Sequence, residues 1–176
     1  MTLTTRRLTL VACPVEAAQA LLDSPPGGAR LLGAAVPPCW LSPELEEIIL
    51  LHLQELLHDP RALGWGVWFA IGRQDHAIVG EAGFKGKPDR DGTVEIGYAI
   101  APPHRGRGYA TEAVEALCRW SFTHPEVRRV VAECAPDNVA SIRVLEKTGF
   151  HQIGSRAGFS YWENAGTQAS LPRSTH

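Results

Sequence analysis

Long apolar runs and an excess of positive charge are both missing from this 176-residue chain. No uninterrupted apolar stretch reaches about 18 residues, the length that a membrane-spanning helix needs, and the N-terminus MTLTTRRLTLVAC lacks the apolar core and cleavage site of a secretory signal. The formal net charge is -2, so the chain as a whole offers no basic field to a nucleic acid or an anionic membrane. We therefore expect a cytoplasmic protein without nucleic-acid or membrane partners, in which any anion site is local.

Metal-ligand spacing is missing as well. The four cysteines form no CxxC pair and no cysteine–histidine cluster, and the seven histidines contain no HxxxH pair. We therefore expect no metal centre, and we interpret Cys13, Cys39, Cys118 and Cys134 as buried thiols.

What the chain does contain is the composition of one globular domain. Hydrophobic residues make up 44% of it and charged residues 20%, which is enough for a core that needs no disulfide or metal. We predict a single domain over residues 1–164 and a polar, disordered tail over residues 165–176.

Hydrophobic spacing predicts an α+β fold with one mixed sheet. We expect helices at residues 14–22, 43–57, 109–123 and 138–148, with Ser42 and Asn138 as N-caps of two of them. The stretch SPPGGAR, residues 24–30, is expected to break the first helix and to lead into an irregular segment. We expect strands at residues 7–12, 65–73, 76–86, 93–101, 128–135, 151–156 and 159–164.

The stretch HRGRGYATEA, residues 104–113, joins the end of a strand to the start of a helix. The first N–H groups of a helix lack intrahelical partners, and the helix dipole places partial positive charge there. Gly106 and Gly108 allow the backbone to approach a ligand closely, and Arg105 and Arg107 add charged donors suited to phosphate. This pattern predicts a pyrophosphate site; the alternative is that the two arginines are only solvated surface charge.

Spacing separates this loop from two other phosphate-binding motifs. A P-loop requires GxxxxGK[ST], which the sequence does not contain, and a dinucleotide-binding fingerprint requires a glycine where the chain has Thr111. The loop instead matches a third pattern, Q/R-x-x-G-x-G/A, as Arg105-x-x-Gly108-x-Ala110.

With this loop, VEIGYAIAPPHRGRGYATEAV and the later NVASIRVLEKTGF resemble the GNAT (GCN5-related) N-acetyltransferases. The resemblance covers residues 64–162 well and the N-terminal third loosely. It is strongest to the RimJ/RimL-like branch, which contains ribosomal-protein and spermidine acetyltransferases and in which homodimers are common. It implies a mixed, mostly antiparallel sheet of six to seven strands flanked by helices, with two central parallel strands that splay apart.

Acetyl-CoA is the acetyl donor that the resemblance implies. The backbone of Tyr98, Ala99, Ile100 and Ala101 would pair with the pantetheine arm like an added strand, and Asn138 and Ser141 would meet that arm near the sulfur. The pyrophosphate would lie against the loop residues Arg105, Gly106, Arg107, Gly108, Tyr109, Ala110 and Thr111.

The implied chemistry is attack of a neutral amine on the thioester carbonyl, with a backbone N–H stabilising the oxyanion. Strand alternation places Glu95 on one face with Gly97 and Ala99, which makes it the candidate base. The alternative is a carboxylate paired to a neighbouring arginine. Glu81, in the preceding strand, is a second and weaker candidate, because the surrounding sequence EAGF is typical of residues packed in a core.

The sequence departs from the family at the expected acid. Many members carry a tyrosine seven residues after the asparagine, where this chain has Leu145. Ser141, one helical turn after Asn138, is the candidate replacement, as in the ribosomal-protein branch; the alternative is that its hydroxyl only bonds the helix backbone.

Two classes of function stay open from the sequence. The first is an N-acetyltransferase acting on a primary amine, either a small molecule or a peptide N-terminus. The second is a catalytically silent CoA-binding or regulatory module, which the leucine at position 145 suggests. Four aromatic residues could line an acceptor pocket, although core packing is the commoner role for such residues in strands: Trp65, Trp68, Phe69 and Trp162.

Overall fold

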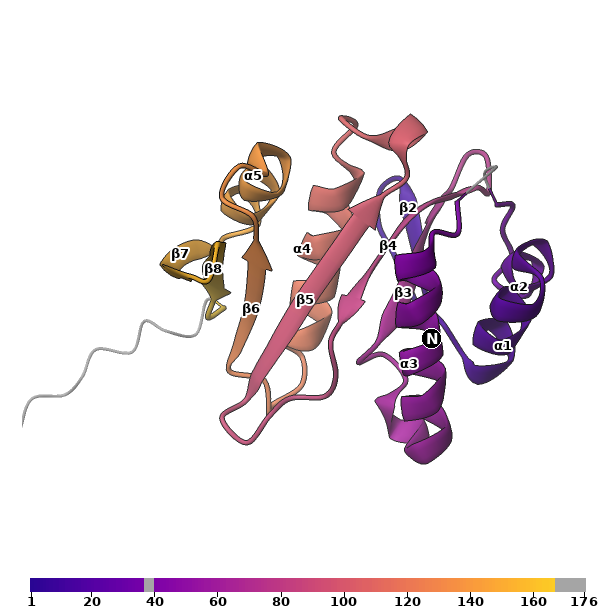
Figure 1. Ribbon diagram of the computed structural model, residues 1–176, viewed down its shortest axis with the longest axis horizontal. Coiled ribbons are helices and arrows are strands. Elements are labelled where there is room, and N and C mark those ends of the chain that lie inside the picture. The colour runs from indigo at the N-terminus through magenta and orange to yellow at the C-terminus, as the bar shows by residue number, and fades with distance from the viewer. Residues whose placement is uncertain (37–39, 167–176) are drawn as a thin grey trace, which may run out of the picture.

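The computed structural model describes residues 1–36 and 40–166 and contains one eight-stranded sheet (Figure 1). The strand order is β1-β2-β3-β4-β5-β6-β8-β7, and the described neighbours are antiparallel except for β5 and β6. The strands are β1 (Thr2–Thr4), β2 (Leu8–Ala12), β3 (Val67–Gly72), β4 (Ile78–Phe84), β5 (Thr93–Ile100), β6 (Arg129–Cys134), β7 (His151–Arg156) and β8 (Phe159–Asn164). The predicted fold class is confirmed, and the count rises above seven because Thr2–Thr4 pairs with β2.

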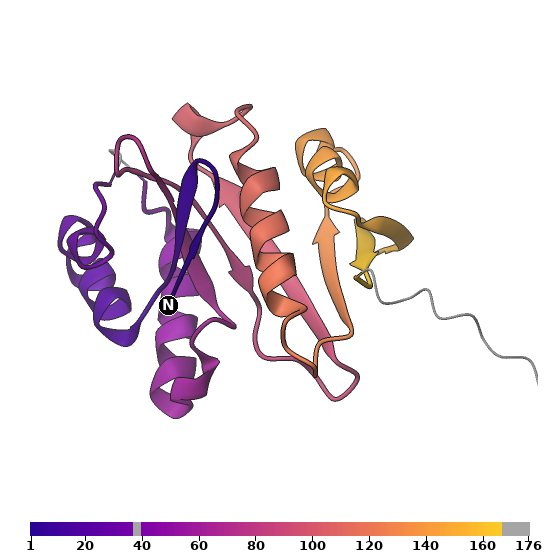
Figure 2. The ribbon, with the colours of Figure 1, turned by 180° about the vertical axis from the view of Figure 1, so that it is seen from behind.

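Helices cover both faces of the sheet. The helices are α1 (Val15–Asp23), α2 (Pro25–Leu31), α3 (Pro43–His58), α4 (Tyr109–Ser121) and α5 (Val139–Lys147), with short 3-10 turns η1 (Pro60–Ala62) and η2 (Pro102–His104). Figure 1 shows α3 in front of the sheet, and Figure 2, from behind, shows α4 crossing the other face.

Two apolar clusters hold these layers together. In β3 alternate side chains point to opposite faces: Trp68 and Ala70 join the cluster beneath α4, whereas Val67, Phe69 and Ile71 join the cluster beneath α1 and α3. All six residues of β3 are buried for this reason. The face covered by α1 and α3 is called the front face below.

The expected break at residues 24–30 is wrong in part, because a second helix starts there. Ser24 is extended (φ -157°, ψ 99°) and ends α1, but Pro25 then opens α2. Proline fits the first turn of a helix, since its missing N–H would have no partner there. Gly28 lets α2 pack on α1, because a Cβ at this position would lie 2.4 Å from the Leu21 side chain.

Two predicted helix starts are confirmed by their caps. Ser42 Oγ accepts a hydrogen bond from the Leu45 N–H over 3.3 Å, and Asn138 Oδ1 accepts one from the Ser141 N–H over 3.1 Å. Cys13, Cys118 and Cys134 are buried, as expected, whereas Cys39 and residues 167–176 of the predicted tail lie outside the described residues. In the part of the chain that the structure covers, no helix combines the length and the apolar character needed to cross a bilayer.

Candidate active site

The parallel strands β5 and β6 part half-way along their length. Their register pairs Thr93 with Arg129, Val94 with Val130 and Glu95 with Val131, and within the described residues the ladder ends there. Figure 1 shows the two strands diverging toward their carboxyl ends. The splay that the resemblance implied is therefore present.

Backbone groups of β5 face the opening. Lys85 N–H bonds the Glu95 carbonyl and Ala101 N–H bonds the Val79 carbonyl, both over 2.9 Å. Antiparallel ladders use every second residue, so the odd-numbered residues of β5 bond β4, whereas Tyr98 and Ile100 direct their N–H groups toward β6. Of the four residues predicted to pair with a pantetheine arm, Tyr98 and Ile100 have this orientation.

The predicted anion loop follows at the end of β5. Gly106 and Gly108 have φ values of 73° and 78°, in the left-handed region where glycine is favoured. Gly108 is the N-cap of the 13-residue α4 and brings no side chain to the first-turn amides, so these amides stay accessible to an anion.

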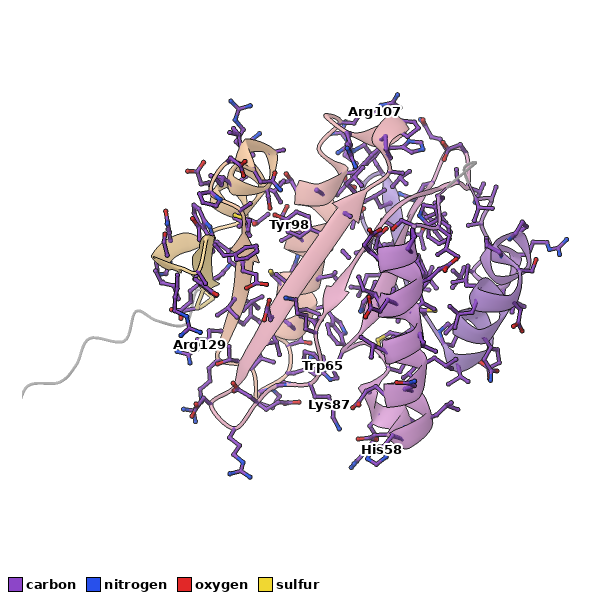
Figure 3. The ribbon with its side chains drawn as sticks, viewed as in Figure 1. His58, Trp65, Lys87, Tyr98, Arg107 and Arg129 are labelled. Atoms are coloured by element: carbon purple, nitrogen blue, oxygen red, sulfur yellow. The ribbon has the colours of Figure 1, made fainter. Side chains whose placement is uncertain are left out.

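The two loop arginines have different surroundings. Arg105 is tied back to the strand, because its Nε donates to the Ile100 carbonyl over 2.9 Å. Arg107 is exposed, and Figure 3 shows it at the tip of the loop. One guanidinium therefore shapes the loop while the other stays available to a ligand.

A third arginine, which the sequence analysis missed, braces this loop. Arg7 Nη1 donates to the Arg107 carbonyl over 2.7 Å, and its guanidinium lies 4.7 Å from the centre of the Tyr109 ring. Arg7 Nε also donates to Glu112 Oε2. Burial alone would raise the pKa of Glu112, but hydrogen bonds from Thr5 and Arg7 outweigh it and lower that pKa.

A pair of hydroxyls bridges the splayed region. The Tyr98 hydroxyl on β5 lies 2.8 Å from Ser141 Oγ on α5 and 3.2 Å from the Ser141 carbonyl oxygen. Figure 3 shows the Tyr98 side chain on the side of β5 that faces α5. Leu145, at the position of the family tyrosine, is fully buried in the core.

Glu95, the first candidate base, is engaged by a cation. Lys85, directly after β4, forms ion pairs with Glu95 and, over 3.2 Å, with Glu133 of β6. Burial alone would lower the pKa of Lys85, but the two carboxylates outweigh it and raise that pKa. Glu95 is therefore a paired carboxylate, as the alternative interpretation held, but its partner is a lysine instead of an arginine. The register of β4 on β5 places Lys85 opposite Glu95.

Glu81, the second candidate, lies on the front face without a charged partner. Its Cα is paired with that of Ala99 on one side and that of Phe69 on the other, so its side chain shares the front face with theirs. Among the described residues Glu81 forms no ion pair. Burial raises the pKa of Glu81 to about 7.

The front face of β5 beside Glu81 is open. A Cβ built on Gly97 would meet no atom within 4 Å, and Ala99 is exposed. On the far side of Glu81, Phe69 packs edge-on against Trp40 with ring centres 5.3 Å apart. Aromatic residues on one side and an uncovered stretch of β5 on the other therefore flank the Glu81 carboxylate, which has no ion-pair partner among the described residues.

The four predicted aromatic residues belong to the core. Trp68 and Phe69 are fully buried, and Trp65 and Trp162 are 7% and 5% exposed. Trp65 packs against Phe84 and Trp120. Within residues 1–36 and 40–166, no three His, Cys, Asp or Glu side chains are grouped so that they could hold a metal ion.

Comparison with known proteins gives the same picture over most of the chain. The family model "Acetyltransferase (GNAT) domain" matches residues 34–151. The N-acetyltransferase YjdG of Bacillus subtilis (strain 168) is 31% identical over 160 residues, which cover 91% of this chain and 95% of YjdG. The ribosomal-protein-serine acetyltransferase of Escherichia coli (strain K12) is 32% identical over 87 residues, 49% of this chain and 48% of that protein.

A solved structure is similar in fold. RimL, a ribosomal L7/L12 alpha-N-protein acetyltransferase in complex with coenzyme A, aligns with a TM-score of 0.65 at 19% identity and covers 94% of this chain and 98% of its own. The family match, the YjdG match and the splayed strands agree: the chain belongs to the GNAT acetyltransferases and is an acyltransferase.

Proposed function

We propose that this protein transfers the acetyl group of acetyl-CoA to a primary amine of a small molecule or a peptide N-terminus. The observation that carries the proposal is the parting of β5 and β6 directly before the glycine loop. It brings two recognition elements together: the N–H groups of Tyr98 and Ile100 that point toward β6, and the first-turn amides of α4.

The residues present fit acetyl-CoA. The pyrophosphate would be held by the amides around Gly106 and Gly108 and by Arg107, and the pantetheine arm by the outward backbone groups of β5. Side chains do not fill the loop, since a Cβ on Gly106 would meet nothing within 4 Å. When bound, acetyl-CoA supplies an activated acetyl thioester; the protein supplies position and a base.

Glu81 is the base we propose. It lies beside Ala99 on the open front face, and with a pKa of about 7 it is partly ionised at neutral pH and still basic enough to take a proton from an amine. Glu95 is less suited, because its carboxylate is already held in an ion pair by Lys85. Instead, Lys85 joins the three strands at the point where β5 and β6 part.

Enzyme assays with a panel of amines test the function. Purified protein is mixed with acetyl-CoA and amines of low and high pKa, thiol release is followed with a thiol reagent, and the acetylated amine is identified by mass spectrometry. We expect turnover with at least one amine. Tight CoA binding without turnover of any amine, including peptides with free N-termini, would instead favour the silent module.

Paired substitutions test the choice of base. We expect Glu81→Gln to lower kcat by about 100-fold or more, the range typical of a lost general base, and to remove the rise of activity through about pH 7. Glu95→Gln should leave that rise in place. If Glu95→Gln abolishes it and Glu81→Gln does not, the assignment is reversed.

A further inference from the structure

We propose that Tyr98 is a positioning residue for the leaving sulfur: its hydroxyl donates to Ser141 Oγ and leaves the Ser141 proton free to hydrogen-bond the thiolate. This inference rests on the proposed function. It adds a role for the Tyr98 side chain, whereas the proposed function uses only the Tyr98 backbone. The two hydroxyl oxygens are 2.8 Å apart, on opposite sides of the splayed region.

Two hydroxyls stabilise a leaving thiolate better than one, because the second hydroxyl keeps the serine proton available. A lone serine hydroxyl can satisfy itself on a helix carbonyl, and its proton is then unavailable to a ligand. Tyr98 carries one proton and its only acceptors within reach among the described residues are Ser141 Oγ and the Ser141 carbonyl oxygen. When it donates to Oγ, the Ser141 proton is not used on Tyr98 and is left for a sulfur acceptor, such as the neighbouring Cys134 thiol or a bound thiolate. It is also a stronger donor, since chains of hydrogen bonds polarise one another.

The backbone of Ser141 fixes the place of its hydroxyl. Ser141 N–H donates to Asn138 Oδ1 over 3.1 Å, which anchors the first turn of α5. The dipole of the nine-residue α5 also favours negative charge at this end. The hydroxyl pair and the helix therefore favour an anion at the same point.

The neighbouring groups leave Tyr98 as a donor. Burial raises its pKa to about 12, although the Ser141 hydrogen bond opposes the rise, so the phenol keeps its proton over the working pH range. The titratable groups that face it are Cys134 of β6 and Cys118 of α4. Burial raises the pKa of both thiols, although a Ser141 hydrogen bond opposes the rise at Cys134, so neither places a charge beside the pair.

The reaction balances without a proton leaving Tyr98 or Ser141. The amine nitrogen forms its bond to the acetyl carbon, the carbon–sulfur bond breaks, and the electron pair of that bond stays on sulfur. The nitrogen's proton passes to Glu81 and then to water, and the product thiol regains a proton from solvent. The hydroxyl pair lowers the energy of the charge on sulfur between these events, as preorganised donors do elsewhere.

The test measures the thiol pKa of bound coenzyme A. Wild type, Tyr98→Phe, Ser141→Ala and the double variant are saturated with CoA, with affinity checked by calorimetry, and thiolate absorbance is followed against pH with desulfo-CoA as the blank. We expect Tyr98→Phe to raise the bound thiol pKa by about one unit, a tenfold change in ionisation. Ser141→Ala should raise it similarly, and the double variant by no more than either alone.

Activity gives a second readout and a control. Tyr98→Phe keeps the ring, so we expect a lower kcat with an unchanged KM for acetyl-CoA, whereas Tyr161→Phe on β8 should match wild type in both. A Tyr98→Phe protein whose bound thiol titrates like that of wild type would overturn the inference and leave the acetyltransferase function standing. Failure of wild type to bind CoA would instead overturn the proposed function.

Discussion

Arg7 Nε donates to Glu112 Oε2 over 2.7 Å and so joins the turn before β2 to the first turn of α4. The same guanidinium holds the Arg107 carbonyl and covers the Tyr109 ring. Because these contacts bracket Gly108, Arg7 fixes the path of the loop whose amides we assign to the pyrophosphate. Preorganisation of this kind lowers the entropic cost of binding.

Removing this brace should weaken CoA binding. We expect Arg7→Gln to reduce CoA affinity about 5- to 30-fold, which corresponds to the loss of about 1–2 kcal/mol. Calorimetry measures it, and Arg6→Gln is the matched control, because Arg6 is the exposed neighbour whose carbonyl, rather than its side chain, is bonded. Equal affinities for the two variants would show that the loop does not need Arg7.

A side chain at Gly108 should affect binding more than its backbone strain explains. Gly108→Ala places a Cβ at φ 78° and 3.4 Å from Arg7 Nη2, whereas Gly33→Ala imposes a similar φ of 73° in open space. Both variants should lose about 1 kcal/mol of stability, measured by urea denaturation. Only Gly108→Ala should lose CoA affinity, and loss in both would point to a global effect of strain.

Glu81 should lower stability at high pH. Its folded pKa of about 7 lies above the ordinary value, so the unfolded chain releases this proton first, and the contribution of Glu81 to stability disappears as pH rises through about 7. We therefore expect Glu81→Gln to stabilise the fold at pH 8 by about 1–3 kcal/mol and to have little effect at pH 4. An equal effect at both pH values would contradict the raised pKa.

His52 should make stability fall in mild acid. Its ring is buried in α3 and its Nε2 donates to the Cys13 carbonyl over 2.8 Å. Burial lowers the pKa of His52, although that hydrogen bond opposes the change. The unfolded chain therefore binds the proton more readily, and stability is lost as pH drops below about 6.5.

Denaturation midpoints at pH 5 and pH 7.5 test this dependence. The difference between the two should shrink in His52→Gln but persist in His58→Gln, which changes an exposed histidine of the same helix (Figure 3). If the His52→Gln difference equals that of wild type, the pH dependence comes from another group.

Local patterns predicted the elements that carry the site, but not the partners across them. The helix after Gly108 and the Asn138 cap depend on residues close together in the sequence, and both were predicted correctly. The partners of Glu95 and Tyr98 depend on strand register and splay, so Lys85 and the hydroxyl of Ser141 carried no sequence signal as their partners. Arg7 was missed because about 100 residues separate it from the loop it braces.

Which of Glu81 and Glu95 is better placed to act as the base likewise could not be predicted from the sequence. Strand alternation predicted a face for Glu95 only, and the environments of the two carboxylates differ because only Glu95 lies opposite a lysine. The paired prolines and glycines of SPPGGAR predicted a break, but in the structure α1 ends at this stretch and α2 begins within it.

The placement of the diphosphate is tested most directly by backbone amide NMR. Labelled protein is titrated in parallel with CoA and with pantetheine, which has the arm but no diphosphate. We predict that CoA shifts the amides of residues 106–110 strongly, whereas pantetheine leaves them in place and shifts residues 96–100. If CoA shifts residues elsewhere in the fold and leaves the amides of Gly106 and Gly108 unchanged, the site assigned to this loop is contradicted.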